Sequence, residues 1–234
     1  MKKHWRIWNS LWNLFFPSCC IVCGRPLLQT EEFLCLHCLS HLSRTGLHMI
    51  PENKMERNFW GKIPIEKATA FLHYAKGGDV RQVLYELKYY GNKEFGKMLG
   101  MCMAHEIQSS DFFYGIDGII PVPLHPERLR QRGYNQSEWL AKGISEVTGI
   151  PVLNNVVERI QFTKSQTHKS HLDRWESVQG QFRCVDKKVL LGKHILLVDD
   201  VMTTGATLVA VADSMKDIEG LRFSVLTLAL AGQD

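Results

Sequence analysis

Hydrophobic residues along this chain follow two patterns, continuous apolar runs and apolar positions at helical spacing. Runs of the length of a buried strand occur at residues 67–74, 118–123, 195–198 and 222–230. Apolar residues recur every three or four positions in residues 80–90, 95–103, 134–148 and 208–215. Because strand-like and helix-like segments follow one another in turn, the pattern predicts an α/β fold with a buried parallel sheet.

The chain is organised around residues 194–215, HILLVDDVMTTGATLVAVADSM. An apolar run ends there at two adjacent carboxylates, Asp199 and Asp200, shortly before a predicted helix. The residues between acids and helix include small or hydroxyl-bearing ones that let backbone N–H groups close on an anion: Thr203, Thr204, Gly205, Ala206 and Thr207. A helix N-terminus carries partial positive charge and unpaired donors, so this order predicts a site for a phosphorylated sugar. The phosphate would lie in the loop, with ribose hydroxyls or a hydrated Mg²⁺ at the carboxylates.

The plainer alternative is an ordinary strand-to-helix turn with N-capping threonines. Such a turn explains one threonine or aspartate but not the whole ordered string.

Arginines follow the second predicted strand. The segment LHPERLRQRGYNQ comes directly after residues 118–123 and contains Arg128, Arg130 and Arg132. Guanidinium groups bind phosphate oxygens in a forked geometry, and ligands of open α/β sheets bind beyond the carboxyl ends of the strands. We therefore expect this segment to bind pyrophosphate, a solvated basic loop being the plainer alternative.

Two CxxC pairs near the N-terminus supply four thiols at metal-binding spacing: Cys20, Cys23, Cys35 and Cys38. Four thiolates satisfy the tetrahedral preference of Zn²⁺, so the pairs predict a structural zinc site. Two disulfides or simple core thiols are the alternatives, and Cys19, His37 and His41 are substitute ligands. Because a closed Cys₄ site has no open position, this zinc would be architectural or partner-binding.

The remaining segments set the expected domain limits. Residues 1–18 place aromatic side chains at helical spacing and predict an amphipathic helix, packed on this protein or docked on a partner or membrane surface. Polar residues interrupt its apolar stretch, which disfavours a secretory leader. A zinc-ribbon-like module is expected at 19–45, a linker at 46–64 and the α/β domain at 65–234. The polar stretch at 159–182 is expected to be a loop that closes over the ligand or contacts a polyanion.

Composition narrows the class of protein without naming an activity. The 234 residues are 45% hydrophobic and 22% charged, which is typical of a soluble globular protein and excludes a disordered one. A net charge of +4 suits anionic ligands but does not identify a nucleic-acid binder. No apolar run approaches the roughly 20 residues of a transmembrane helix.

Several motifs in order resemble one family. The CxxC pairs, LKYYGNKEFG, PVPLHPERLRQRGYNQ, TKSQT and LLVDDVMTTGAT follow one another as in the ComF family of competence-associated phosphoribosyltransferase-like proteins. VDDVMTTGAT alone resembles the phosphoribosyl pyrophosphate (PRPP) signature of type I phosphoribosyltransferases. The resemblance covers nearly all of the chain from Cys20 onward. It implies a type I phosphoribosyltransferase fold with a small N-terminal Cys₄ zinc module, and a cytoplasmic role linked to DNA uptake and natural transformation.

The resemblance also implies roles for individual residues. Asp199 and Asp200 would meet the ribose hydroxyls, and with Arg174 they form the implied catalytic set. The implied PRPP-binding residues are Val201, Met202, Thr203, Thr204, Gly205, Ala206, Thr207, Lys88, His125, Arg128, Arg132 and Asn135. Ser177 and Lys169 replace the Asn and Leu of many relatives in the loop around Arg174, a departure that concerns the loop's closing contacts and not the fold.

Two functions of different classes follow from these features. As an enzyme, the protein would hold PRPP with Mg²⁺ and transfer ribose 5-phosphate to an acceptor that the sequence does not identify. As a binding module, it would sense PRPP without turnover, hold single-stranded DNA on its basic loops, and dock a competence helicase or translocase through the zinc module. A homo-oligomer is compatible with either function.

Overall fold

The computed structural model describes residues 18–160 and 180–232. The aromatic helix expected at 1–18 therefore falls outside the described residues except for its last position. Arg174 and the middle of the expected loop at 159–182 fall outside them as well. Within the described part of the chain, no helix is both long enough and apolar enough to cross a membrane.

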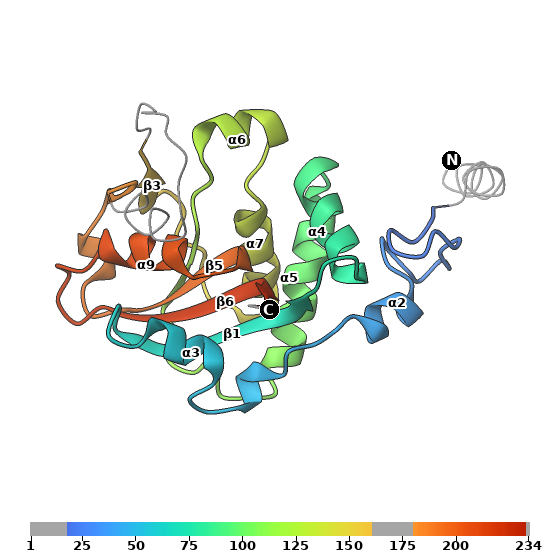
Figure 1. The fold of residues 1–234 in the computed structure, drawn as a ribbon. Coiled ribbons are helices and arrows are strands. Elements are labelled where there is room, and N and C mark those ends of the chain that lie inside the picture. The colour runs from blue at the N-terminus through green and yellow to red at the C-terminus, as the bar shows by residue number, and fades with distance from the viewer. Residues whose placement is uncertain (1–17, 161–179, 233–234) are drawn as a thin grey trace, which may run out of the picture.

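A four-stranded parallel sheet forms the centre of the molecule (Figure 1). Its strands lie in the order β1 (Ile65–Tyr74), β6 (Arg222–Ala231), β5 (His194–Met202) and β2 (Gly118–Pro121). Successive residues of β5 enter two separate hydrophobic clusters, Leu196 and Val198 in one and Ile195 and Leu197 in the other. Burial on both faces is why the sequence shows an unbroken apolar run here. The predicted α/β fold with an open parallel sheet is confirmed.

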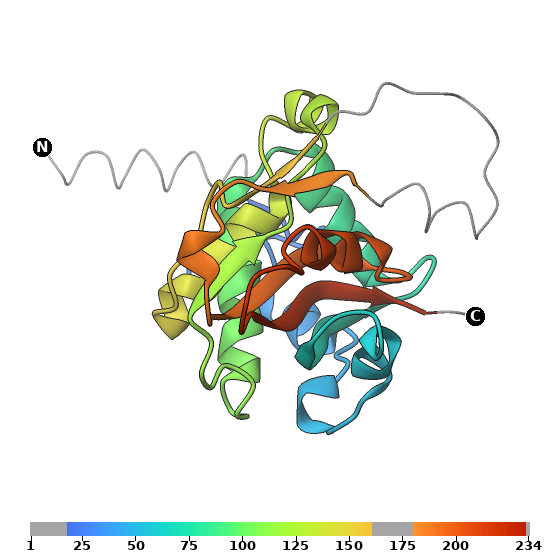
Figure 2. The same ribbon diagram turned by 90° about the vertical axis from the view of Figure 1, so that its left-hand side faces the viewer.

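Helices cover both faces of this sheet (Figures 1 and 2). The helices on one face are α4 (Asp79–Tyr89), α5 (Lys93–Ile107) and α7 (Gln136–Thr148), and those on the other are α3 (Lys54–Phe59) and α9 (Ala206–Asp213). The remaining elements are α2 (Leu36–His41), η1 (Leu47–Met49), α6 (Pro126–Arg132), β3 (Val157–Arg159), β4 (Phe182–Cys184) and η2 (Lys188–Leu190). β3 and β4 pair as a small antiparallel ladder, and α6 projects beyond the sheet in both views.

Helices α5 and α7 approach closely because each contributes a glycine at their contact. A Cβ atom added to Gly100 would lie 2.1 Å from the carbonyl oxygen of Leu140. One added to Gly143 would lie 2.1 Å from the carbonyl oxygen of Lys97. Neither position has room for a side chain, so the two glycines fix how near α7 lies to α5.

Residues 46–64 are not the linker that the sequence predicts. They contain η1 and α3, and Met55 and Phe59 of α3 are buried in the core. Asn53 caps α3, because its Oδ1 accepts from the N–H of Met55 at 2.9 Å. Its Nδ2 donates to the carbonyl of Ala68 in β1 at 2.9 Å, which joins the start of the helix to the sheet. Two apolar positions one turn apart form too short a pattern to reveal a helix in the sequence. Packing against β1 stabilises the helix instead.

The N-terminal cysteine-containing segment packs on α4 and α5 rather than standing apart. Its buried residues belong to the same hydrophobic cluster as those two helices. The ring centroids of Phe33 and Phe95 are 5.5 Å apart. Arg44 Nε donates to Glu106 Oε2 at 2.8 Å, and the guanidinium of Arg44 lies 4.2 Å from the ring centre of Phe71.

Candidate functional site

Two adjacent carboxylates, the acid pair Asp199 and Asp200, lie near the carboxyl end of β5. Asp199 Oδ1 accepts hydrogen bonds from Ser137 Oγ (3.0 Å) and from the backbone N–H of Asp200 (2.8 Å). Asp200 Oδ2 lies 3.1 Å from Lys88 Nζ, and both of these side chains are mostly buried. The acid pair is therefore held by α7 through Ser137 and by α4 through Lys88.

Burial and the neighbouring charge of Asp200 raise the pKa of Asp199 to about 7. The N–H of Asp200, the hydroxyl of Ser137 and the charge of Lys88 act in the opposite direction and do not cancel the increase. Asp199 therefore exchanges a proton near neutral pH. A carboxyl group with so perturbed a pKa at the end of a parallel strand is typical of a functional site.

The loop after the acid pair is held in place by α3. Asn58 Nδ2 donates to the carbonyl oxygen of Thr204 at 2.9 Å. Gly205 has a φ of 78°, and an added Cβ would lie 2.8 Å from Asn58 Nδ2, so both conformation and space require glycine. Thr204 Oγ1 accepts from the N–H of Ala206 (3.4 Å) at the start of α9. Strand, acids, loop and helix thus follow in the expected order.

A cavity of about 450 Å³, the cationic cavity, lies beside α6 and the end of α4. It is lined by Lys88, Tyr89, Arg128, Gln131 and Arg132. Arg132 Nη1 donates to Gln136 Oε1 at 2.8 Å, which ties α6 to the start of α7. Three cationic side chains from two helices line one hollow, an arrangement that suits an anion with several oxygens.

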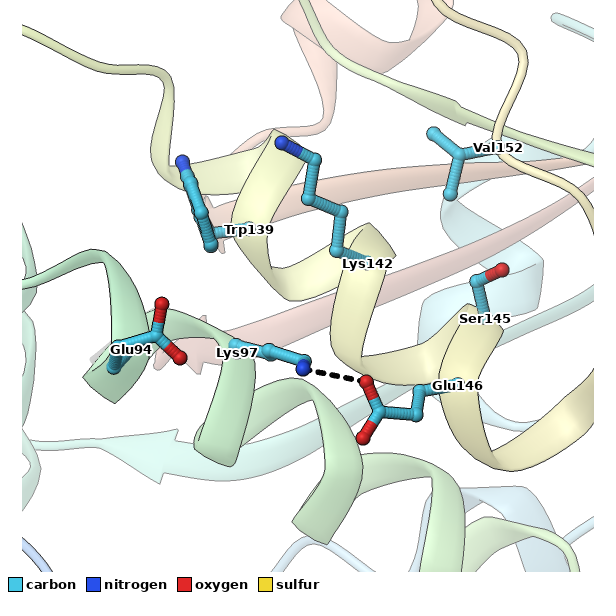
Figure 3. Close-up of a pocket in the computed structure, with 7 residues that line it drawn as sticks. All are labelled: Glu94, Lys97, Trp139, Lys142, Ser145, Glu146 and Val152. Carbon is cyan, nitrogen blue, oxygen red and sulfur yellow. Dashed lines mark ion pairs between the residues drawn. The ribbon is translucent and has the colours of Figure 1, made fainter.

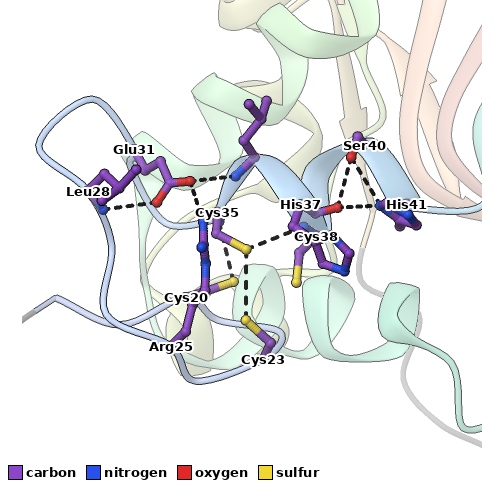
Figure 4. Close-up of polar contacts among 11 residues, drawn as sticks. Cys20, Cys23, Arg25, Leu28, Glu31, Cys35, His37, Cys38, Ser40 and His41 are labelled. Carbon is purple, nitrogen blue, oxygen red and sulfur yellow. Dashed lines mark hydrogen bonds and ion pairs between the residues drawn. The ribbon is translucent and has the colours of Figure 1, made fainter.

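The cysteine cluster forms a separate candidate site (Figure 4). One donor atom from each of Cys20, Cys23, Cys35 and Cys38 lies within 4.8 Å of the others. The Sγ atoms of Cys23 and Cys35 are 3.8 Å apart, and Cys20 Sγ accepts from the N–H of Cys35 at 3.4 Å. Four thiols so close together fit the tetrahedral thiolate coordination of a structural metal ion.

An ion pair braces the turn between the two cysteine pairs (Figure 4). Arg25 Nη2 lies 2.6 Å from Glu31 Oε1. The carboxylate of Glu31 also accepts from the N–H groups of Leu28 (2.9 Å) and Leu36 (2.8 Å). His41 Nδ1 lies 2.8 Å from the backbone carbonyl oxygen of His37, and among the described residues the cluster consists of the four cysteines without either histidine.

Comparison with known proteins shows the family. A family model described as phosphoribosyl transferase domain matches residues 146–234. Competence protein F of Haemophilus influenzae is 37% identical over 219 residues, which is 90% of each chain. Competence protein ComFC of Streptococcus pneumoniae is 32% identical over 81% of this chain and 89% of its own. The chain belongs to the ComF family.

The fold of this ComF protein is of the phosphoribosyltransferase type, with a parallel sheet flanked by helices and a Cys₄ cluster near the N-terminus. A solved structure of glutamine PRPP amidotransferase from B. subtilis matches 62% of this chain and 30% of that chain, with 21% identity and a TM-score of 0.41.

The residues expected to bind PRPP lie in different settings in this ComF protein. Lys88, Arg128 and Arg132 line the cationic cavity. His125 Nδ1 instead accepts from the N–H of Glu127 (3.3 Å) and caps α6. Asn135 Nδ2 donates to the carbonyl of Val122 (3.0 Å), while its Oδ1 accepts from the N–H of Ser137 (3.2 Å). The side chains of His125 and Asn135 therefore position the two helices next to the cavity.

Three side chains near the acid pair were not predicted from the sequence: Asn58, Ser137 and Arg159. Ser137 directly follows the GYNQ segment, so its position was the available signal, whereas Asn58 was hidden in the expected linker. Burial and the charge of Arg128 lower the pKa of Arg159, and the charge of Asp199 opposes that shift. Arg159 is therefore near enough to Arg128 and Asp199 to interact with both charges. Its Nη2 donates to Gln181 Oε1 (2.7 Å), while its buried Nε meets no hydrogen-bond acceptor within the described residues. An unmatched buried donor here is consistent with a bound anion.

A hollow on the outer surface of α5 and α7 has no comparable chemistry (Figure 3). Lys97 Nζ lies 2.6 Å from Glu146 Oε2. Lys142 Nζ lies 2.7 Å from Glu138 Oε1. Lys142 also lies 4.1 Å from the ring centre of Trp139. These cations are already paired, and the hollow shares no lining residue with the cationic cavity, so we assign no ligand to it.

Proposed function

We propose that this ComF protein binds PRPP together with Mg²⁺ and transfers ribose 5-phosphate to an acceptor, releasing pyrophosphate. The observation that carries the proposal is the ion pair between Lys88 and Asp200. Lys88 lines the cationic cavity, and Asp200 precedes the loop at the start of α9. The pair therefore connects a hollow suited to a diphosphate with a loop suited to a single phosphate, as a ligand carrying both groups requires.

Each part of the site has a distinct role in this proposal. The loop at residues 203–207 and the N-terminus of α9 bind the 5′-phosphate through backbone N–H groups. Asp199 and Asp200 accept hydrogen bonds from the ribose hydroxyls. Lys88, Arg128 and Arg132 bind the diphosphate, and Mg²⁺ would neutralise part of its charge when bound.

Catalysis would be chiefly electrostatic. Lys88 and the arginines of the cationic cavity stabilise the negative charge that develops on the departing pyrophosphate, while the acid pair stabilises the positive charge on the sugar. Arg159 adds a further cation close to Asp199. Arg174, which follows β3 and precedes β4 in the sequence and lies outside the described residues, is proposed to take part as well.

We assign Zn²⁺ to the cysteine cluster because four thiolates are the ligand set of structural zinc. The ion would hold residues 20–38 in the conformation that packs on α5. The matched relatives are named competence proteins, which supports a role in competence, and we propose that this role is cytoplasmic and linked to DNA uptake.

A second candidate is a competence protein that senses PRPP without turnover. Single-stranded DNA and a helicase or translocase docked on the zinc module would then be its partners.

Calorimetric titration with PRPP, with and without Mg²⁺, tests the proposed site directly. We expect saturable, Mg²⁺-dependent binding, and Asp200→Ala should weaken it by about 1–3 kcal/mol, the scale of a hydrogen bond to a charged group. The matched control is Asp217→Ala, because Asp217 is an exposed acid whose Oδ2 lies 3.9 Å from Lys187 Nζ. Equal affinity of the Asp200 variant and the control would contradict the assignment of the acid pair. Release of pyrophosphate with an added acceptor separates the enzyme from the sensor.

A further inference from the structure

Helix α3 reaches the loop at residues 203–207 from a distant part of the chain. Asn58 and Thr204 are 146 residues apart in the sequence, and Asn58 Nδ2 donates to the carbonyl oxygen of Thr204 at 2.9 Å. Met55 and Phe59 belong to the same hydrophobic cluster as the buried residues of α9, so α3 and α9 pack on one face of the sheet (Figure 1). The loop therefore has α3 as a support on one side.

The support is held firmly in its own place. A capping box closes the first turn of α3, because Asn53 Oδ1 accepts from the N–H of Glu56 (3.1 Å) and Glu56 Oε2 accepts from the N–H of Asn53 (3.2 Å). Asn53, Met55 and Phe59 are all buried. A shift of Asn58 away from the loop would disturb these buried contacts, so the helix keeps the side chain of Asn58 against Thr204.

A hydrogen bond to the carbonyl of Thr204 also fixes the direction of the next N–H group. The described residues contain no cis peptide bond. In a trans peptide, the C=O and the following N–H point in opposite directions. Because the carbonyl of Thr204 faces Asn58, the N–H of Gly205 faces away from α3. Within the described part of the chain that N–H meets no acceptor, so it is free to donate to an anion.

The conformation of Gly205 adds to this arrangement. Gly205 has φ 78° and ψ 0° directly before α9, and a left-handed residue in such a turn directs successive N–H groups toward one hollow that suits an anion. On the other side, an added Cβ would lie 2.8 Å from Asn58 Nδ2 and 3.1 Å from Phe59 Cε1. Since α3 fills the space on its own side of Gly205, an anion approaches from the opposite side.

We propose that Asn58 is a positioning residue for the 5′-phosphate. By holding the carbonyl of Thr204, it keeps the N–H of Gly205 directed at that phosphate. This inference rests on the proposed function and adds to its site a residue that does not itself contact the ligand. Without Asn58 the peptide group between Thr204 and Gly205 can turn over, and its carbonyl oxygen would then face the phosphate and repel it. Pyrophosphate bound in the cationic cavity would be unaffected.

Nuclear magnetic resonance can observe this single peptide group in the full chain. The sequence contains three Thr–Gly pairs, with glycine at 46, 149 and 205. Threonine labelled with ¹³C at the carbonyl and glycine labelled with ¹⁵N therefore select three amide signals, and Thr204→Ser identifies the signal of Gly205 by removing it. In the unmodified chain, we expect ribose 5-phosphate to shift the signal of Gly205 and to leave those of Gly46 and Gly149 in place.

The same labels report on the hydrogen bond from Asn58. We expect Asn58→Ala to change the carbonyl signal of Thr204 before any ligand is added, because that carbonyl loses its donor. Asn58→Asp keeps the shape of the side chain but cannot donate as a carboxylate, so it should lose the same hydrogen bond. In both variants ribose 5-phosphate should shift the signal of Gly205 less than in the unmodified chain.

Calorimetry separates a positioning role from a general loss of structure. We expect Asn58→Ala to bind ribose 5-phosphate about tenfold more weakly, the scale of one hydrogen bond to a charged group, and to bind pyrophosphate with Mg²⁺ unchanged. Asn154→Ala is the matched control and should change neither affinity. Asn154 is exposed, and the neighbouring Leu153 packs against Gly118 at the start of β2, the opposite end of the sheet from the acid pair.

Three outcomes would overturn a part of this account. Equal ribose 5-phosphate affinity of Asn58→Ala and Asn154→Ala would exclude the positioning role. Equal losses for ribose 5-phosphate and pyrophosphate in Asn58→Ala would exclude it as well, because the whole site would then be damaged. If neither ribose 5-phosphate nor PRPP shifts the signal of Gly205 in the unmodified chain, the proposed function is overturned instead. The carbonyl signal of Thr204 in the unliganded Asn58→Ala chain still decides whether Asn58 orients the peptide.

Discussion

The cysteine cluster and the acid pair differ in how much of the chain each one needs. All four sulfur atoms come from residues 20–38. Cys20 and Cys23 lie at one turn, Cys35 caps the short helix α2, and Cys38 lies in that helix. The acid pair instead depends on Lys88 and Ser137, which reach it from helices far from β5 in the sequence. A site of the first kind requires local folding and a metal ion, whereas the second exists only when the sheet and its helices are packed.

Metal removal should cause the largest loss of folding free energy, and this loss should be confined to the segment that carries the cysteine cluster. We expect a chelator or Cys35→Ser to unfold about residues 20–42, because structural zinc contributes about 10 kcal/mol or more of folding free energy to small modules. The core of the α/β domain should stay folded, since its two hydrophobic clusters are built mainly from the sheet and its helices. Hydrogen exchange with mass spectrometry would locate the loss of protection.

Cys102→Ser is the control for that experiment, because Cys102 lies in α5 and is not part of the cluster. It should leave both the metal content and the protection of residues 20–42 unchanged. Loss of protection throughout the sheet on chelation would show that the cysteine cluster is not the local unit described above.

Gly100→Ala should act in the opposite way, damaging the acid pair and sparing the metal site. The new Cβ would lie 2.1 Å from the carbonyl oxygen of Leu140 and force α5 and α7 apart. We expect a loss of about 3 kcal/mol in the free energy of unfolding, the upper range for overpacking. PRPP affinity should fall as well, because α7 carries Ser137. Denaturant unfolding and calorimetry measure the two effects.

Gly78→Ala is a suitable comparison for the Gly100 substitution. Gly78 has a φ of −84°, and an added Cβ would find its nearest neighbour at 3.7 Å, so the change should cost only the weaker N-cap preference of alanine, about 1 kcal/mol. Equal stability of the two variants would mean that α5 and α7 can separate without cost. A zinc content below that of the unmodified chain in the Gly100 variant would mean that the two sites are coupled.

The pH dependence of PRPP binding should show the smallest effect, and its protein component is expected to come from Asp199. Burial and the charge of Asp200 raise its pKa to about 7, so the carboxylate that accepts from ribose forms only as the pH rises through that value. We expect affinity to fall up to about tenfold per pH unit below it. In Asp199→Asn the part of the pH dependence that comes from Asp199 should disappear, so that only the titration of PRPP itself remains.

The same pKa predicts an opposite trend for the stability of the unliganded protein. Because the folded-state pKa of Asp199 lies above the unfolded-state value, its favourable contribution is complete at acid pH and is lost as the pH rises through about 7. Thermal unfolding of the unmodified chain and of Asp199→Asn between about pH 5 and pH 8 would measure the difference. A difference that does not change with pH would contradict the raised pKa.

The sequence predicted the parts of the fold whose patterns are long or chemically specific. The apolar runs at 195–198 and 222–230 lie within β5 and β6, and the CxxC spacing identified the cysteine cluster. The helix at Lys54–Phe59 was missed because its two buried residues make too short a pattern. Asn58 was missed with it, although it holds the loop beside the acid pair.

The sequence by itself determined which chemical groups this protein can present to a ligand. These are the thiols of two CxxC pairs, two adjacent acids before a loop of small residues, and arginines that follow a strand. Only the tertiary structure decided which of these groups meet. Lys88 reaches Asp200, and Ser137 reaches Asp199, because α4 and α7 pack on the same face of the sheet. Burial then raises the pKa of Asp199, an effect of surroundings that no local stretch of sequence contains. The spacing of residues along the chain determines which ligand atoms lie near one another within a short segment. Packing determines the distances between residues far apart in the sequence and how much water surrounds them.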